Sequence, residues 1–548
     1  MHGLMQEHPL LISGLITHAA KNHGSREVVS RLADGSIHRT NYVTVERRAR
    51  ALAHKLESIG IRPGERVATL AWNGYRHLEC FYGVSGMGAV LHTVNPRLFR
   101  EQIAYIIRHA EDRVLIFDAD LLPIVESIAA EIGCIEHFIV LCDSTELPTA
   151  AHFKLHSYEA WIEGHGENYH WPEFDERSAS SLCYTSGTTG NPKGVLYSHR
   201  STLLHALVIV QADAFALSGH DSVLPFAPMF HANAWSLPYC CPMVGAKLVF
   251  PGRHNDAANL CELLTDEAVT FAVGVPTIFT MLLAHLQETG KTLPAMQRVV
   301  VAGTAMPPAV RVALKDRYGI TAIHAWGMTE TSPIGTIGTA SAEVRALPEA
   351  DRQDVLLKQG RTPYGVQIEV RTAQGAIAPA DGESFGPLWV RGPWVASGYF
   401  KGEGGPVLDG GGWFPTGDVS TWDRYGYMKI TDRTKDVIKS GGEWISSIDV
   451  ENAAMSHPQI ALAATVAAFH PKWDERPVLV VVPAEGQSPT REDVLEFLAT
   501  RMAKWWLPDD VVFVREMPMT ATGKILKSKL REQYWHHLHP ATTSLSPT

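Results

Sequence analysis

Cysteine is scarce in this chain, and its distribution excludes two kinds of covalent scaffold. Among 548 residues there are seven cysteines at irregular intervals: Cys80, Cys134, Cys142, Cys183, Cys240, Cys241 and Cys261. No Cys-x-x-Cys pair occurs, and an odd, unevenly spaced set argues against a disulfide framework and against a thiolate zinc site. We therefore expect a protein of a reducing compartment, namely the cytoplasm.

Basic residues are in deficit, and long apolar runs are missing. The chain has 48 Lys and Arg against 58 Asp and Glu, a formal net charge of −10, whereas nucleic-acid-binding proteins normally carry a basic excess. No uninterrupted apolar run approaches the ~18 residues of a membrane-spanning helix. No Lys or Arg precedes the short apolar segment 9–16, as one would in a secretory signal. We predict neither a nucleic-acid partner nor a membrane span.

The residues that are present have the composition of a folded protein of several domains. Hydrophobic residues make up 45% of the chain and charged residues 19%, which is too apolar for a disordered protein. A single hydrophobic core rarely grows beyond about 250–300 residues, so this length predicts more than one compact unit.

The first part of the chain alternates between helical and strand-like patterns. Apolar residues at helical spacing predict a helix from Val45 to Ile59, ended by Gly60 and Pro63. Strands separated by helices favour an α/β fold with largely parallel sheets. The apolar runs that predict buried strands are 67–72, 89–94, 114–117, 138–141, 247–250, 299–302 and 320–324.

The last third of the chain has a different texture. Glycine and proline are dense around 345–430, which indicates a β-rich subdomain with strands at 367–371 and 388–391. We place a domain boundary at the charged stretch 432–436. The elements expected after it are helices at 448–456, 492–504 and 523–533, the last with Thr522 as its N-cap, and strands at 461–468, 478–482 and 511–514. The His-rich stretch 536–539 is expected to be part of a solvated tail.

Residues 184–194, Tyr-Thr-Ser-Gly-Thr-Thr-Gly-Asn-Pro-Lys-Gly, carry the strongest local signal. Three glycines, four Ser or Thr hydroxyls and one lysine make a loop whose backbone amides can wrap a polyphosphate. The loop is not a Walker A motif, which needs Gly before the lysine and Ser or Thr after it, whereas Pro192 and Gly194 occupy those places. We predict a phosphate-binding loop of another kind.

This loop and seven further segments, in the same order, resemble the adenylate-forming superfamily of acyl-CoA synthetases, firefly luciferase and peptide-synthetase adenylation domains. The segments look most similar to bacterial medium-chain fatty acid–CoA ligases and methylmercaptopropionate–CoA ligases. They are Met-Phe-His-Ala-Asn-Ala-Trp at 229–235, Ala-Gly-Thr-Ala at 302–305, 324–331, Trp-Phe-Pro-Thr-Gly-Asp at 413–418, 432–438, 439–446 and Thr-Gly-Lys-Ile at 522–525.

The resemblance implies an architecture and a reaction. It implies a large N-terminal AMP-binding domain (1–432), a hinge (433–436), a small mobile α+β domain (437–535) and a tail (536–548), with a homodimer as the assembly. A carboxylate would attack the α-phosphate of ATP to give acyl-AMP and pyrophosphate, and the thiol of coenzyme A would then displace AMP. ATP, Mg²⁺ and coenzyme A are therefore the expected cofactors and co-substrates.

The resemblance also assigns nucleotide-binding roles. Glu330 and Thr185 are expected to bind Mg²⁺, because a hard cation prefers oxygen ligands. Asp418, with Arg433 beside it, is expected to accept the two ribose hydroxyls. Thr304 stands where many relatives have Gly or Ser, which leaves the acyl packing open. The other residues expected at the ATP and acyl-adenylate site are Ser186, Gly187, Thr188, Thr189, Gly190, Lys193, His231, Gly303, Ala325, Trp326, Gly327, Met328 and Thr329.

The remaining roles concern catalysis, movement and the acyl chain. Lys524 is expected to stabilise the charged transition state at phosphorus, and in the first turn of a helix at 523–533 it would oppose the helix dipole. Lys435 is expected at the hinge. Trp235, together with Gly303 and Thr304, is expected to contact the acyl chain, although a tryptophan is often simply part of a core. After the domain movement the pantetheine channel would be lined by Lys439, Gly441, Gly442, Glu443 and Trp444.

Several readings stay open at this point. The favoured substrate is a medium-chain fatty acid, with 3-methylmercaptopropionate as the alternative. A luciferase-like oxygenase would use the same acyl-AMP, and a phosphotransferase would use the Gly-rich loop for γ-phosphate transfer. A noncatalytic acyl-CoA-binding protein is disfavoured because Lys524, Glu330 and Asp418 are all present.

Overall fold

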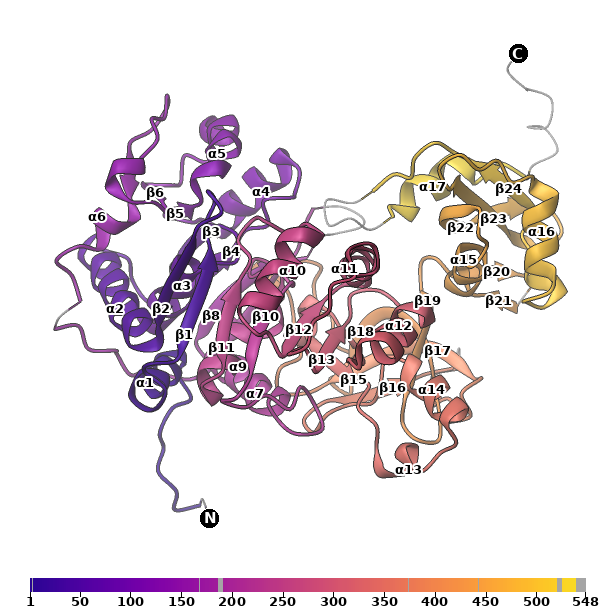
Figure 1. Ribbon diagram of the computed structural model, residues 1–548, viewed down its shortest axis with the longest axis horizontal. Helices are drawn as coiled ribbons and strands as arrows, with labels where there is room; N and C mark the ends of the chain where they lie inside the picture. Colours follow the sequence, from indigo (N-terminus) through magenta and orange to yellow (C-terminus); the bar gives the residue numbers. More distant parts are fainter. Residues whose placement is uncertain are drawn as a thin grey trace. The chain divides into compact units, whose positions relative to one another are not determined.

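A computed structural model describes residues 1, 3–166, 168–185, 191–372, 374–441, 443–519 and 525–538 (Figure 1). These residues form two compact units: 1–185, 192–367 and 390–414 belong to the first, and 368–389 and 415 onward to the second. This division does not coincide with the boundary expected at 432–436, which stays a prediction about where the chain moves.

The first unit contains a seven-stranded sheet in the order β7-β6-β5-β3-β4-β8-β9, parallel except for the β8–β9 pair. Its strands are β3 (Arg66–Leu70), β4 (Val90–Thr93), β5 (Val114–Phe117), β6 (His137–Val140), β7 (Leu155–Ser157), β8 (Ala179–Tyr184) and β9 (Gly194–Ser198). Most of the predicted strands of this region are thereby confirmed within one or two residues.

The same unit contains an eight-stranded sheet in the order β15-β14-β13-β12-β10-β11-β1-β2. Its inner strands are parallel, and β2 and β15 pair antiparallel at the two edges. The strands are β1 (Glu27–Arg31), β2 (Ile37–Asn41), β10 (Ser222–Pro225), β11 (Lys247–Phe250), β12 (Phe271–Gly274), β13 (Arg298–Val301), β14 (Thr321–Gly327) and β15 (Ile334–Ile337).

Helices cover both faces of the two sheets because successive strand residues point to opposite sides. Val67 packs into a core shared by both sheets, while its neighbour Ala68 packs into the core on the outer side. Val28 and Val29 divide in the same way between the shared core and the outer core of the second sheet. The helices are α1 (Ile12–Asn22), α2 (Tyr42–Ser58), α3 (Tyr75–Gly86), α4 (Arg100–Ala110), α5 (Leu122–Ile128), α6 (Tyr158–Ile162), α7 (His199–Ile209), α8 (Ala232–Trp235), α9 (Leu237–Val244), α10 (Ala257–Asp266), α11 (Pro276–Thr289), α12 (Pro308–Tyr318), α13 (Ala342–Arg345) and α14 (Glu349–Leu357).

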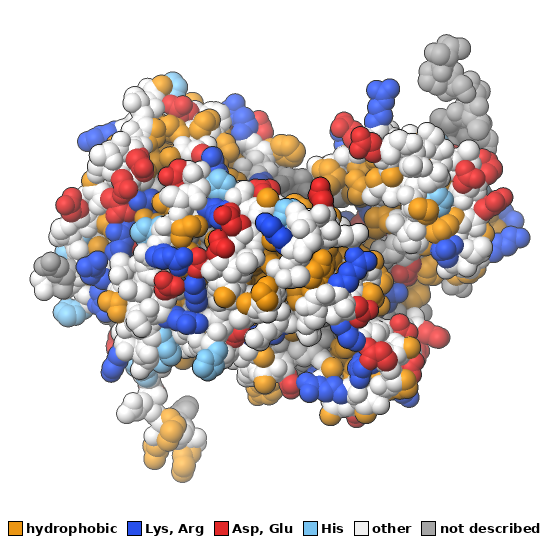
Figure 2. Space-filling view, in the orientation of Figure 1, with side chains coloured by type: hydrophobic (Ala, Val, Ile, Leu, Met, Phe, Trp, Pro, Cys, Tyr) orange, Lys and Arg blue, Asp and Glu red, His pale blue; other side chains and the backbone are white. Residues whose placement is uncertain are grey.

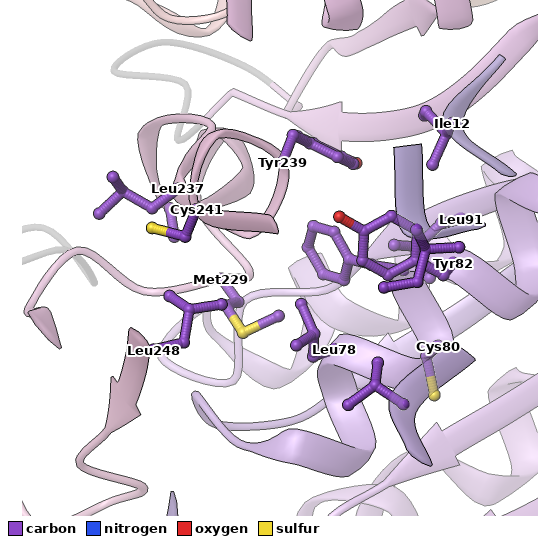
Figure 3. Packing of buried hydrophobic residues seen from close by; sticks show 14 of the residues in the cluster. Ile12, Leu78, Cys80, Tyr82, Leu91, Met229, Leu237, Tyr239, Cys241 and Leu248 are labelled. Carbon is purple, nitrogen blue, oxygen red and sulfur yellow. The ribbon is translucent and has the colours of Figure 1, made fainter. Parts of the chain in front are cut away.

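Side chains of α3 and α9 meet in the shared core, where Tyr82 and Tyr239 are in contact (Figure 3). Tyr82 and Tyr239 lie edge to face with their ring centroids 6.2 Å apart, and the Tyr82 hydroxyl donates to the carbonyl of Pro238 at 2.5 Å. Cys80 and Cys241 are buried here as free thiols, and all seven cysteines of the chain are unpaired.

The second unit holds, apart from a few strand ends, a four-stranded sheet (β16-β17-β18-β19) and a five-stranded sheet (β21-β20-β23-β22, with β24 on β23). The α/β class and the smaller α+β part are thereby confirmed. The strands are β16 (Gln367–Val370), β17 (Phe385–Arg391), β18 (Phe414–Trp422), β19 (Met428–Arg433), β20 (Ile438–Ser440), β21 (Glu443–Ile445), β22 (Ile460–His470), β23 (Asp474–Pro483) and β24 (Asp510–Phe513), and the helices are α15 (Ser447–Met455), α16 (Arg491–Ala499) and α17 (Lys527–Tyr534).

Three predictions for the end of the chain are wrong. The helix expected at 492–504 ends at Ala499. The helix expected from 523 begins only at Lys527, because Ile525 pairs with Met519 in an isolated bridge and the Leu526 amide donates to Pro518 at 2.7 Å. His537 lies within hydrogen-bonding distance of Asp510 (Nε2 to Oδ2, 2.7 Å), so 536–538 belong to the folded unit. Residue 539 lies outside the described part.

The surface and the helices carry two observations that bear on partners. Over the face seen in Figure 2, Lys and Arg side chains are interspersed with Asp and Glu. Of the helices in the described ranges, none combines the length and the apolar character needed to cross a membrane.

Candidate functional site

Glu330 lies just beyond the carboxyl end of β14, where open parallel sheets place their ligand sites. It belongs to a single 3-10 turn, η4 (Thr329–Thr331), and only 6% of the residue is exposed. The Thr331 hydroxyl accepts from the Met328 amide at 3.0 Å, and the Ala396 amide donates to the Glu330 carbonyl at 2.8 Å. The backbone of the turn that carries Glu330 is therefore fixed from two sides.

Tyr399 contacts the Glu330 side chain directly. Its hydroxyl donates to Oε1 of Glu330 at 2.7 Å. Burial and the negative charge of Glu330 raise the pKa of Tyr399, so the hydroxyl stays protonated and can act as a donor. Sequence analysis missed this residue, because a lone Gly-Tyr-Phe triplet among many glycines carries no pattern of its own.

The predicted phosphate-binding loop connects β8 to β9, and its base is closed by two hydrogen bonds between Thr185 and Lys193. The Thr185 amide donates to the Lys193 carbonyl at 2.9 Å, and the Lys193 amide donates to the Thr185 hydroxyl at 3.2 Å. Lys193 Nζ lies 4.8 Å from the centroid of the Tyr399 ring. Thr185, Lys193, Tyr399 and Glu330 thus form one continuous chain of contacts. Ser186, Gly187, Thr188, Thr189 and Gly190 lie outside the described residues.

The base of this loop rests on a polar and aromatic layer. Tyr184 and His109 share a hydrogen bond (Oη to Nδ1, 2.7 Å), and burial raises the pKa of Tyr184. Gly194 allows close packing here, since a Cβ at this position would lie 3.0 Å from Leu182 Cδ1 and 3.0 Å from Phe400 Cβ. The third glycine of the motif therefore permits close packing at the base of the loop.

Trp235 ends a short left-handed turn that follows β10. Residues 232–236 all have φ between 42° and 71°, although none is a glycine, and each such residue costs about 1–2 kcal/mol. Asn233 holds the turn by donating to the Ser181 hydroxyl at 3.0 Å. Trp235 is 6% exposed and packs in the shared core with Leu237. His231 precedes the turn, and its amide donates to the Pro228 carbonyl at 3.0 Å.

His324 lies on β14 and forms hydrogen bonds with residue 306 and with the end of α14. Sequence analysis did not single it out. Its Nε2 accepts from the Met306 amide at 3.3 Å, and its Nδ1–H donates to the Leu357 carbonyl at 2.7 Å. Burial lowers the pKa of His324 to about 4, as both hydrogen bonds of a neutral imidazole require. Gly303 (φ +88°) and Thr304 are exposed.

The 325–329 stretch is largely buried in the first unit. Ala325 and Trp326 are buried, and Gly327 packs so closely that a Cβ would come 1.9 Å from the Pro333 carbonyl. The Thr329 carbonyl accepts from the Tyr197 hydroxyl at 2.6 Å, while Met328 is half-buried.

In the second unit, Asp418 and Arg433 face each other across the antiparallel β18–β19 pair. Arg433 Nε lies 2.9 Å from Asp418 Oδ1, and the Asp418 side chain is 4% exposed while that of Arg433 is 53% exposed. The Asp418 amide also donates to the Thr416 hydroxyl at 3.1 Å. The carboxylate is held in one orientation beside a solvent-accessible cation.

The candidate hinge residue Lys435 is exposed in a turn between β19 and β20. Arg531 of α17 donates to the Lys435 carbonyl and pairs with Asp436 at 2.7 Å. The turn is therefore anchored to the last helix of the second unit.

The expected channel residues follow this turn. Lys439 is exposed on β20, and Gly441 has φ +61° beneath the Trp473 ring, which a Cβ would approach to 2.7 Å. Trp444 packs against Phe385 with centroids 5.4 Å apart. Gly442 and Lys524 lie outside the described residues, as does the side chain of Glu443.

Comparison with known proteins identifies relatives over the whole chain. A family described as "AMP-binding enzyme" matches residues 16–400, and one described as "AMP-binding enzyme C-terminal domain" matches residues 449–524. The chain is 49% identical over 534 residues to the 3-methylmercaptopropionyl-CoA ligase of Ruegeria pomeroyi, covering 97% of this chain and 99% of that protein. It is 47% identical over 545 residues to the medium-chain-fatty-acid–CoA ligase of Ectopseudomonas oleovorans, covering 100% of both. The crystal structure of the anthranilate CoA ligase AuaEII in complex with anthranoyl-AMP is similar at a TM-score of 0.82 and 26% identity, covering 95% of this chain and 97% of that one.

Proposed function

Since the chain belongs to the AMP-binding enzyme family, we propose that it is an AMP-forming acid–thiol ligase that converts a carboxylate into its coenzyme A thioester. A carboxylate oxygen attacks the α-phosphorus of ATP, and pyrophosphate leaves. The sulfur of coenzyme A then attacks the carbonyl carbon of acyl-AMP, and AMP leaves. The observation that best supports this is the contact chain Thr185–Lys193–Tyr399–Glu330, which connects a cation and a carboxylate at the phosphate loop.

The first half-reaction needs positive charge at the phosphates. Lys193 and Lys524 supply it from the protein, and prepositioned charge of this kind stabilises a transition state without reorganisation. The Thr185 hydroxyl and the Glu330 carboxylate are the oxygen donors that a hard divalent cation prefers, so they fit Mg²⁺. When bound, Mg²⁺ would neutralise charge on the phosphate oxygens. Asp418 would accept the ribose hydroxyls.

The adenine and the acyl-adenylate would lie against residues 303–306 and 325–329, next to the hydrogen bond between the Met306 amide and His324. His231, Gly303 and Thr304 are the residues we assign to this side of the site. The exposure of Gly303 and Thr304 supports this assignment.

The second half-reaction would follow a rotation about Lys435. The turn that carries Lys435 is exposed, and the loop beyond it contains Gly441, whose positive φ permits close approach of a ligand. Lys439, Gly441, Gly442, Glu443 and Trp444 would then line the path of the pantetheine arm.

The acyl group is proposed to be aliphatic and of medium length. Segment 229–235 is mostly apolar, and an amino acid substrate would need a buried charge partner for its ammonium group. 3-Methylmercaptopropionate is the second candidate, because the 49% identical relative carries that substrate in its name. We further propose that the enzyme acts in the cytoplasm and that it is a homodimer. Light scattering on the purified protein tests the dimer.

One assay separates the ligase from the alternatives. The purified protein is incubated with ATP, Mg²⁺, coenzyme A and a panel of carboxylates, and the products are separated by chromatography. AMP, pyrophosphate and an acyl-CoA in equal amounts support the proposal. ADP as product would replace it with γ-phosphate transfer, and light emission with oxygen would replace it with a luciferase-like reaction. Acyl-CoA binding without turnover would make the protein noncatalytic.

A further inference from the structure

Residues 394–404 run beside the turn that carries Glu330, and their first part is bonded to it. The Ser332 hydroxyl donates to the Trp394 carbonyl at 2.8 Å, and the Trp394 ring nitrogen donates to the Ile334 carbonyl at 3.2 Å. The Ala396 amide donates to the carbonyl of Glu330 itself at 2.8 Å. This end of the 394–404 segment therefore moves only if the Glu330 turn moves with it.

The other end of the 394–404 segment is bonded to the α4 region. Glu403 accepts from the Tyr105 hydroxyl at 2.9 Å, and Lys401 Nζ lies 2.6 Å from Glu111 Oε1. Gly404 lies against the lysine of the phosphate loop, since a Cβ there would come 2.9 Å from Lys193 Nζ. A segment held at both ends keeps the residue in its middle, Tyr399, in one position.

Tyr399 uses two different parts of its side chain on two different partners. The hydroxyl donates to Glu330 Oε1 at 2.7 Å, and the ring attracts Lys193 Nζ at 4.8 Å from its centroid. Hydrogen bonds to a charged acceptor are directional, so the hydroxyl fixes the orientation of the carboxylate. The ring does the same for the ammonium group.

We propose that Tyr399 is a positioning residue that holds the Glu330 carboxylate and the Lys193 ammonium group in the orientations needed to bind a metal-bound triphosphate. The inference rests on the proposed function. It assigns no chemical step to Tyr399, which acts only through its two partners.

The ring and the hydroxyl can be separated by substitution. Tyr399→Phe keeps the ring for Lys193 and removes only the donor to Glu330, whereas Tyr399→Leu removes both. Tyr105→Phe is the matched control, because it deletes a hydroxyl that donates to Glu403, away from Glu330, and leaves the Lys401–Glu111 pair to hold that end of the 394–404 segment.

The main measurement is direct binding of Mn²⁺ to the protein–ATP complex, followed by electron paramagnetic resonance without any carboxylate present. Substitution of a residue that orients a metal ligand typically lowers metal affinity 10–100-fold. We expect Tyr399→Phe to weaken Mn²⁺ at least about tenfold, and Tyr105→Phe to leave it within about twofold. Tyr399→Leu should in addition weaken metal-free ATP, which Tyr399→Phe should not. Thioester formation from supplied acyl-AMP should be unchanged in Tyr399→Phe.

A double-mutant cycle with Glu330→Gln decides whether Tyr399 acts through Glu330. In that background Tyr399→Phe should cost less than about twofold in Mn²⁺ affinity. Equal losses in both backgrounds, or equal effects of Tyr399→Phe and Tyr105→Phe, would overturn the inference. A folded wild type that binds Mn²⁺–ATP but forms no acyl-AMP from any carboxylate would overturn the proposed function instead. Should Tyr399→Phe not fold, the cycle is run with Tyr399→Leu, whose loss of Mn²⁺ affinity should be smaller in the Glu330→Gln background than in the wild type; equal losses would overturn the inference.

Discussion

Lys527 and Lys529 of α17 have different surroundings, which matters for testing the role expected of Lys524. The Lys527 side chain is half-buried and has two polar partners. Its Nζ lies 2.6 Å from Glu451 Oε1 and donates to the Ser447 hydroxyl at 2.7 Å. Removing one partner of such a pair leaves an uncompensated charge, so Lys527 serves the fold of the second unit. A test of Lys524 therefore needs a control lysine without this duty, and the exposed Lys529 on α17 provides one.

We expect Lys524→Ala to lower the rate of acyl-AMP formation about 10²–10³-fold, the usual cost of removing one prepositioned electrostatic group. Thioester formation from supplied acyl-AMP should stay close to that of the wild type, because the charge is needed only at phosphorus. Single-turnover measurements of each half-reaction check both points, with Lys529→Ala as control. Equal losses in the two half-reactions would assign Lys524 to the structure.

His324 predicts a pH dependence of stability. Its folded pKa of about 4 lies below the unfolded value of 6.5, so its contribution is complete above pH 6.5 and is lost as the pH falls toward 4. Between pH 7 and pH 5 this amounts to about 2 kcal/mol of the free energy of unfolding. In urea denaturation, the difference between wild type and His324→Gln should shrink by about that amount over this range. The exposed His220 serves as control, and a difference that stays constant would contradict the assigned surroundings of His324.

At the scale of helices and strands, apolar patterning predicts most of the first unit. The runs at 114–117 and 247–250 coincide with β5 and β11, because strands buried on both faces are continuously apolar. The helix expected at 523–533 begins only at Lys527, because Ile525 pairs with Met519 in a short antiparallel bridge that apolar periodicity did not predict.

The candidate site was predictable where a motif carries it and unpredictable where packing does. Lys193 and Glu330 stand in recognisable segments, whereas Tyr399 and His324 act through partners brought together by folding. Trp235 shows the same limit: its segment is recognisable, but the left-handed turn that buries it depends on Asn233 reaching Ser181 on another strand.

The turn of residues 434–436 is the element on which the second half-reaction is expected to depend. Lys435→Pro fixes φ near −65° and restricts the pivot, so acyl-AMP should still form while its transfer to coenzyme A slows at least about tenfold. Lys435→Ala removes the charge but leaves φ free, and it should retain both half-reactions. The two steps are measured separately by rapid quench. Normal steady-state thioester production by folded Lys435→Pro would exclude a pivot at this residue.

For the whole molecule, the residues assigned to the reaction are divided between the two compact units. The contact chain from Thr185 to Glu330 lies within the first unit, and the Asp418–Arg433 pair and the Lys435 turn lie within the second. The phosphate-side groups and the groups assigned to ribose and to movement thus belong to different units.

The last prediction concerns the acyl chain of the proposed substrate, which we expect to enter an apolar tunnel. Each methylene that enters an apolar tunnel contributes about 0.8 kcal/mol, and about 1.4 kcal/mol corresponds to a factor of ten. Four additional carbons on a butyrate-sized acid can therefore raise kcat/KM by up to about 200-fold. We expect hexanoate to decanoate to exceed butyrate, with a decline once the tunnel is full. Competition among C4 to C16 acids and 3-methylmercaptopropionate, which is about as long as a C5 acid, measures this order. A clear preference for the sulfur compound over octanoate would replace the medium-chain assignment by the second candidate and leave the ligase chemistry intact.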